Sequence, residues 1–130
     1  MVRSYVSVTV PLETGEIRIA GTHLQHRDQD VDSRLAQIDV LLEALGSPDA
    51  TVLAGDMNAE PGSQEIERLE TFGFTSVQDV LGTDLVTSWR DGTTIDHILV
   101  GSGVAATSIV VVDDARSSDH LPLVATVSLA

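Results

Sequence analysis

The sequence predicts an α/β fold of the α+β type, in which a mixed, largely antiparallel sheet carries two helices on one face. Two segments, 32–45 and 63–72, repeat apolar residues at helical spacing, whereas residues 4–10 alternate with the period of a strand. Apolar runs of strand length follow toward the end of the chain. The order is therefore strand, strand, helix, strand, helix and three strands, within one domain of 130 residues.

The first elements are a hairpin and a helix. Residues 13–16 supply a turn between strand 4–10 and a partner strand at 16–21, which is followed by His23. The helix then begins after Asp30 or Asp32, either of which can cap it, and Gly46 with Pro48 ends it. Its apolar face consists of Val31, Leu35, Ile38, Leu42 and Leu45.

The rest of the chain alternates short strands with one more helix. Residues 51–54 form a buried strand, and the helix over 63–72 turns Ile66, Leu69 and Phe72 inward before Gly73 ends it. Residues 75–93 are the least regular part and are expected to be a loop at the rim of a site. The three closing strands are expected at about 94–100, 107–112 and 121–128.

The composition limits the function. Twenty acidic residues against seven arginines, with no lysine, give a net charge of −13, so a basic groove for nucleic acid is not favoured, although nucleic acid stays possible. The chain has no cysteine, which excludes disulfides and thiolate chemistry. We see neither a signal segment nor a membrane span, and we therefore expect a soluble protein, cytoplasmic by default, with the compartment unknown.

One face of the sheet lacks a cover. The runs 52–54, 109–112 and 121–129 are apolar at consecutive positions, as in strands that are buried on both faces. Two helices cover only one face of such a sheet. We therefore expect the other face to be covered by a second copy of the chain, in a homodimer or higher oligomer, or by a further half of the domain.

Polar residues gather where apolar strands stop. Asp56 and Asn58 follow strand 51–54, and in extended backbone their side chains point the same way. Both are also common turn residues, so a turn before Pro61 explains them equally well. His23 follows another strand, where a core histidine is as good an interpretation as a functional one.

His120 needs a carboxylate from elsewhere in the chain. Its neighbour Asp119 faces the opposite way in extended chain, whereas Asp96 lies in an apolar strand where a lone carboxylate is costly to bury. We therefore predict that Asp96 pairs with His120 and that Asp119 is free for a cation. His26 and His97 are interpreted as structural or surface residues. No serine triad, zinc motif or phosphate-binding glycine loop is present.

Four segments resemble successive motifs of the endonuclease/exonuclease/phosphatase superfamily, which has a deoxyribonuclease I-like fold. They are Gly21-Thr22-His23-Leu24, Gly55-Asp56-Met57-Asn58-Ala59-Glu60-Pro61, Thr94-Ile95-Asp96-His97-Ile98 and Ser118-Asp119-His120-Leu121-Pro122. Each motif alone is weak, but four in the right order and spacing are a strong signal. The resemblance covers nearly the whole chain.

The resemblance implies a magnesium-dependent (or manganese-dependent) phosphoester hydrolase, of the phosphodiesterase, nuclease or phosphatase kind. It implies that His120 is the catalytic histidine and that Asp96 orients it. Asp56 would position or deprotonate the attacking water, Asn58 would stabilise the transition state, and His23 would contact the phosphate. The implied metal ligands are Asp119, Asp56 and Asn58.

The match extends only to the C-terminal half of the superfamily's four-layer α/β/β/α sandwich, because the first half, with its own metal-binding Asn and Glu, has no counterpart in residues 1–130. Magnesium prefers near-octahedral oxygen coordination, so we expect the chain alone to bind metal weakly and to have little activity. The alternative function is a catalytically incomplete module that self-associates through its uncovered sheet face. The substrate, whether nucleic acid, phospholipid or small phosphoester, is not indicated.

Overall fold

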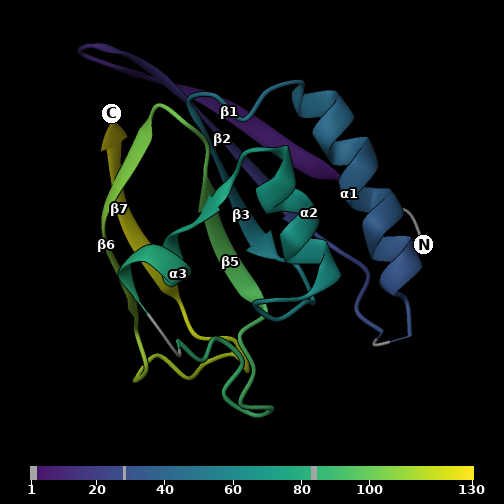
Figure 1. Ribbon diagram of the computed structural model, residues 1–130. Helices are drawn as coiled ribbons and strands as arrows, with labels where there is room; N and C mark the ends of the chain where they lie inside the picture. Colours follow the sequence, from purple (N-terminus) through teal and green to yellow (C-terminus); the bar gives the residue numbers. More distant parts are fainter. Residues whose placement is uncertain (1–2, 28, 83–84) are drawn as a thin grey trace.

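The computed structural model describes residues 3–27, 29–82 and 85–130. Its elements, shown in Figure 1, confirm the predicted α+β class, with three helices in place of the two expected. In chain order they are β1 (Tyr5–Leu12), β2 (Gly15–His23), α1 (Val31–Leu45), β3 (Thr51–Asp56), α2 (Gln64–Phe72), β4 (Thr75–Ser76), α3 (Val77–Leu81), β5 (Asp96–Val100), β6 (Val104–Val111) and β7 (Leu123–Leu129).

The main sheet has five strands in the order β1-β2-β3-β5-β4. Only the β2–β3 pair is parallel, because α1 carries the chain back across the sheet between these two strands; the other pairs are antiparallel. The C-terminal ends of β2 and β3 and the N-terminal end of β5 therefore lie at one edge of the sheet. Figure 1 shows this edge below the β3 arrowhead.

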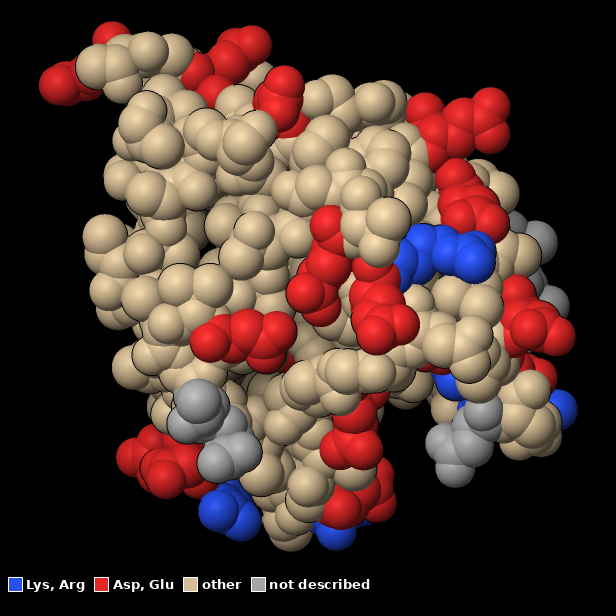
Figure 2. Space-filling view, in the orientation of Figure 1, with Lys and Arg blue, Asp and Glu red and all other residues tan. Residues whose placement is uncertain are grey.

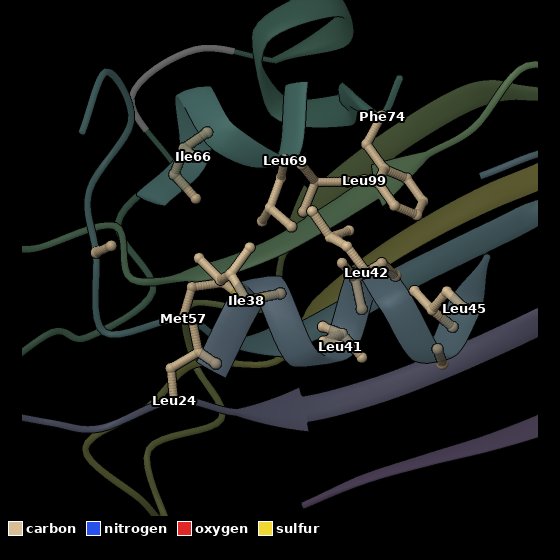
Figure 3. Close-up of a cluster of buried hydrophobic side chains, with 13 residues drawn as sticks. Leu24, Ile38, Leu41, Leu42, Leu45, Met57, Ile66, Leu69, Phe74 and Leu99 are labelled. Atoms are coloured by element: carbon tan, nitrogen blue, oxygen red, sulfur yellow. The ribbon is translucent and has the colours of Figure 1, made fainter. Parts of the chain in front are cut away.

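Helices α1 and α2 cover one face of this sheet and enclose the larger hydrophobic core (Figures 1 and 3). Ser63 caps α2 through a hydrogen bond from the Ile66 backbone N–H to its Oγ. Arg34 and Glu65 join the two helices through a buried ion pair, with 2.7 Å between Nε and Oε1. The core side chains that Figure 3 labels are Leu24, Ile38, Leu41, Leu42, Leu45, Met57, Ile66, Leu69, Phe74 and Leu99.

Strands β6 and β7 do not extend the main sheet, contrary to our expectation of one sheet. They form a separate two-stranded antiparallel sheet that packs on the face opposite α1 and α2. The residues of β7 alternate between half-buried and exposed, with Leu123 and Val127 turned toward Ile17 and Val52 of the main sheet and Val124 turned outward. The apolar runs 109–112 and 121–129 thus belong to a hairpin that is buried on one face, whereas the run 52–54 lies in β3, which is buried on both faces as predicted, with Leu53 in the first core and Val52 in the second.

The expectation of an irregular loop over residues 75–93 is wrong for its first part. Residues 75–81 form β4 and α3, and α3 fills the space between β5 and β6. Val77 packs into the second core, while Ser76 accepts a hydrogen bond from the Asp79 backbone N–H and caps the helix. A two-residue strand and a five-residue helix are too short to show a hydrophobic period.

The β6–β7 hairpin leaves part of the second sheet face open. Val6, Val8 and Ile19 remain 68%, 56% and 39% exposed, and they share this face because β1 and β2 pair Val8 with Ile19. The uncovered face is therefore smaller than the sequence indicated, and it is restricted to the β1 side of the sheet. Among the described residues, no helix has the length and apolar character that crossing a membrane requires.

Candidate active site at the edge of the sheet

The strand register brings three predicted residues together. His23 is opposite Asp56 in the β2–β3 pair, and Asp56 is opposite Asp96 in the β3–β5 pair. Cross-strand partners point to the same face, so all three side chains project from the second sheet face at one edge. His23 Nε2 lies 3.4 Å from Asp56 Oδ2, while the Arg3 guanidinium lies 3.5 Å from His23 Nδ1.

The backbone around Asp56 has unusual local geometry. Gly55 has φ +148°, and a side chain there would collide with the Thr22 carbonyl oxygen of β2. Asn58 adopts φ +48°, a left-handed conformation that asparagine tolerates better than most residues. Its backbone N–H donates to Asp56 Oδ1, and its side-chain Nδ2 donates to the Leu24 carbonyl. These contacts fix the orientation of both side chains.

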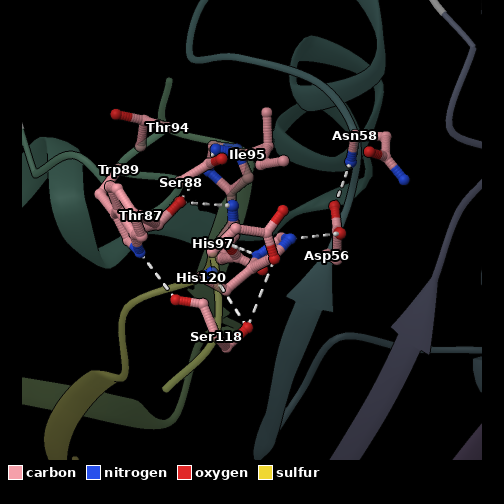
Figure 4. A network of polar contacts seen from close by, with 12 residues as sticks. Asp56, Asn58, Thr87, Ser88, Trp89, Thr94, Ile95, His97, Ser118 and His120 are labelled. Carbon is pink, nitrogen blue, oxygen red and sulfur yellow. Dashed lines mark hydrogen bonds and ion pairs between the residues drawn. The ribbon is translucent and has the colours of Figure 1, made fainter. Parts of the chain in front are cut away.

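His120 lies between two carboxylates, as Figure 4 shows. Its Nδ1 is 2.8 Å from Asp96 Oδ2, which is the pairing that the sequence predicts, and its Nε2 is 3.7 Å from Asp56 Oδ2. An isolated antiparallel β-bridge between the backbones of Ser88 and His120 holds the loop before β7 against the loop before β5. The imidazole is thus oriented by Asp96, with its second nitrogen facing Asp56.

These neighbours change the proton affinities at the site. Burial acts to lower the pKa of His120, but the hydrogen bond and charge of Asp96, with the charges of Asp56 and Asp119, outweigh it and raise that pKa above its ordinary value. Burial also raises the pKa of Asp56, although the Asn58 N–H opposes this effect. The site therefore favours a proton on His120.

Two residues that we did not predict hold Asp96 in place. The buried Thr87 Oγ1 accepts hydrogen bonds from the backbone N–H groups of Ile95 and Asp96, both at 3.1 Å. Gln78 of α3 donates to the Asp96 carbonyl at 2.7 Å and accepts from the Ile98 N–H at 3.1 Å. Gln78 therefore forms hydrogen bonds with the backbone groups of β5 that the short strand β4 does not reach. Neither residue lies in one of the four motifs, so no sequence signal pointed to them.

The remaining histidines lie outside the contacts of His120. His97 is 1% exposed on the helix side of the sheet, and its Nε2 hydrogen-bonds to the Ala59 carbonyl at 2.7 Å. Burial lowers the pKa of His97, which keeps it neutral. His26 is exposed in the segment after β2, at the lip of a hollow that also contains Asn58 and Ile95.

One group of side chains among the described residues could hold a metal ion. It consists of Asp56, Asp96 and His120, which each offer a ligand atom within 4.8 Å of the others. Asp119, a predicted metal ligand, is exposed and is not part of this group. Carboxylate oxygens suit magnesium or manganese, while the imidazole is committed to Asp96.

Residues 3–120 match the Endonuclease/Exonuclease/phosphatase family, and the chain belongs to it. Members of this family are phosphoester hydrolases and typically use divalent metals. The comparison with curated proteins returned no match. This match confirms the resemblance to the endonuclease/exonuclease/phosphatase superfamily that the four motifs indicate.

Solved structures agree with this assignment. A functionally unknown conserved protein from Enterococcus faecalis V583 is 26% identical, with a TM-score of 0.74 over 88% of this chain and 51% of that chain. The endonuclease/exonuclease/phosphatase from Beutenbergia cavernae is 21% identical, with a TM-score of 0.84 over 98% and 39%. The human Nocturnin catalytic domain with bound sulfate is 22% identical, with a TM-score of 0.75 over 98% and 53%. The chain spans about half the length of these structures.

Proposed function

We propose that the chain is the C-terminal, catalytic half of a magnesium- or manganese-dependent phosphodiester hydrolase. The observation that carries this proposal is the arrangement of His120 between Asp96 and Asp56, with Nδ1 held at 2.8 Å and Nε2 left 3.7 Å from the second carboxylate. The family assignment supports phosphoester hydrolysis as the class of reaction. The lengths of the solved structures support the idea of a half domain.

The gap between His120 and Asp56 suits an attacking water. A separation of 3.7 Å is too long for a direct hydrogen bond, but one water can contact both atoms. As the water oxygen bonds to phosphorus, Asp56 accepts a proton from the water and His120 donates a hydrogen bond to an oxygen of the phosphoryl group. The bond from phosphorus to the leaving oxygen breaks, and that oxygen takes up a proton from solvent. Asp96 keeps the imidazole in the tautomer with Nδ1 protonated and stabilises its positive charge.

The residues next to Asp56 bind the negatively charged phosphoryl group of the substrate. His23 and Asn58 flank Asp56, where the imidazole and the amide can contact phosphoryl oxygens. A divalent ion held by Asp56, with Asn58 as a further oxygen donor, would supply neutralisation of the negative charge on the phosphoryl group. Positioning and charge neutralisation provide most of the catalysis in phosphoryl transfer.

Hydrolysis of bis-p-nitrophenyl phosphate tests the proposal. The chain alone, with magnesium or manganese, should turn over slowly or not at all, because its oxygen ligands fill only part of an octahedral shell. Joining it to the amino-terminal half of its domain should raise the rate. His120→Ala should abolish this activity, since it removes the group that faces both Asp56 and the phosphoryl oxygen.

His26→Ala is the matched control, because His26 is an exposed histidine in the segment after β2 and lies outside the group formed by His120 and its two carboxylates. It should keep the activity of the unaltered protein. Fast turnover by the purified chain alone, abolished by His120→Ala, would show that the site needs no second half. Turnover that survives His120→Ala would contradict the assigned role.

The second candidate function is a catalytically incomplete module that self-associates. Three exposed apolar side chains on one face of β1 and β2, namely Val6, Val8 and Ile19, favour it. This candidate predicts an oligomer with no metal-dependent hydrolysis under any of the conditions above.

A further inference from the structure

Two of the chain's seven arginines are gathered on its single tryptophan, next to the loop that carries His120. The guanidinium carbon of Arg90 lies 5.4 Å from the centroid of the Trp89 ring, and that of Arg116 lies 5.2 Å from it. Both distances fall within the range of cation–π contacts. The two arginines are far apart in sequence, so only the fold brings them together.

Trp89 is anchored on the loop of the candidate site. Its backbone N–H donates to the Asp119 carbonyl at 3.0 Å, and its indole Nε1 donates to the Ser118 carbonyl at 2.7 Å. Figure 4 shows Trp89 and Ser118 beside His120. Two hydrogen bonds fix the plane of the ring, which in turn holds the two guanidinium groups at the rim of the site.

The arginines have no carboxylate partner within the described part of the chain, although acids are close in sequence. Asp91 and Asp113 lie in the same loops, yet the Arg116 guanidinium donates to the backbone carbonyl of Asp113 rather than to its carboxylate. Two positive side chains near one ring repel each other, and a bound anion offsets this repulsion. What distinguishes Arg90 and Arg116 is that both lie on one ring in a chain of net charge −13.

The surroundings of this pair suit a ligand. A surface hollow beside it is lined by Trp89, Arg116 and Asp113, with Val86, Val111 and Leu121 as an apolar wall, while Arg90 lies outside this lining. Figure 2 shows acidic side chains across much of the visible face, with only a few basic side chains among them. An anion is therefore repelled over most of this face, and the two guanidinium groups on Trp89 are the positive charge beside the candidate site.

We propose that Arg90 and Arg116, held by Trp89, bind a second phosphate group of the substrate, distinct from the one that is hydrolysed. Guanidinium groups form paired, charge-assisted hydrogen bonds with phosphate oxygens, and the aromatic ring fixes them in advance. Assigning the ligand to the substrate rests on the proposed function. The binding itself does not, and it can be measured without catalysis.

Trp89 is also the reporter for the test, because it is the only tryptophan of the chain. Titration with inorganic pyrophosphate at constant ionic strength should change its fluorescence with saturation. The double variant Arg90→Gln/Arg116→Gln should weaken this binding roughly tenfold or more, because it removes both charge-assisted contacts. Arg90→Lys/Arg116→Lys keeps the charge without the planar fork and should be intermediate.

Arg68→Gln is the control, since Arg68 pairs with Asp39 on the exposed side of α1 and α2, and it should leave binding unchanged. A response that is not saturable, that equals the effect of added salt, or that survives in the double glutamine variant would overturn the proposal. His120→Ala should keep the fluorescence response, so a failure of the proposed hydrolysis is distinguishable from a failure of this site. Further arms with a nucleoside bisphosphate and an inositol bisphosphate assign the phosphate to a nucleotide or to a lipid headgroup by whichever binds more tightly.

Discussion

Replacing Gly55 with alanine should both destabilise the fold and disturb the candidate site. A Cβ at this position would lie 1.9 Å from the Thr22 carbonyl oxygen, whereas ordinary contacts begin at 3.4 Å. The oxygen belongs to β2, so relief of the clash requires β2 and β3 to separate by about 1.5 Å at the register position next to His23 and Asp56. The parallel pairing that aligns these two residues would then be lost locally.

The size of the effect follows from two terms. Losing about two backbone hydrogen bonds of the β2–β3 ladder costs about 1 kcal/mol each, and the positive φ of +148° adds about 1–3 kcal/mol of strain for a residue with a side chain. We expect Gly55→Ala to lower the free energy of unfolding by about 3–5 kcal/mol. This is a large fraction of the about 5–15 kcal/mol typical of a small domain.

Urea denaturation followed by Trp89 fluorescence measures this change, and two other glycines separate its causes. Gly62 has φ +81° and open space within 4 Å of the position that a methyl group would take, so Gly62→Ala should show only the conformational cost, about 1–2 kcal/mol. Gly21 lies in β2 with its nearest contact at 3.8 Å, and Gly21→Ala should be close to neutral. The reasoning is refuted if Gly55→Ala costs no more than Gly62→Ala.

Three further predictions concern charge, metal and assembly. Asp96→Asn should lower the pKa of His120 in the metal-free chain, because it removes the charge that raises this pKa. A histidine titration by NMR would show the change, and an unaltered titration curve would show that Asp96 does not interact with His120. Magnesium should bind weakly by calorimetry and not at all after Asp56→Asn, whereas tight binding by the chain alone would contradict a partial shell. The chain should form a homodimer or higher oligomer through its open sheet face, and Val8→Asp should shift it to monomer in light scattering; a monomeric unaltered chain with no dye binding would refute this.

The strand ends were predictable because they depend on local patterns. Strand 51–54 ends at a glycine followed by Asp56, and this signal alone places the carboxylate at a sheet edge. The pairing of Asp96 with His120 followed from the cost of a lone carboxylate in an apolar strand. Both inferences use only the neighbours of a residue along the chain.

Other contacts between distant segments could not be predicted in this way. The separate β6–β7 sheet depends on which strands pair, and apolar runs alone do not specify the partner. Gln78 and Thr87 support Asp96 from a region without a hydrophobic period. Arg90 and Arg116 each look like an ordinary loop charge until the fold places them on one ring.

The charge distribution at the sheet edge links the two sites. Asp56 and Asp96 are direct cross-strand partners, an arrangement of like charges that destabilises a sheet unless a positive group intervenes. His120 supplies that group in the metal-free chain, because the two carboxylates raise its pKa and so favour its protonated, positively charged form. A site that favours positive charge attracts a divalent cation but repels a free phosphoester. The proposed cation at Asp56 and the proposed phosphate site at the arginine pair on Trp89 would together offer a polyanionic substrate positive charge at two points of an otherwise acidic surface.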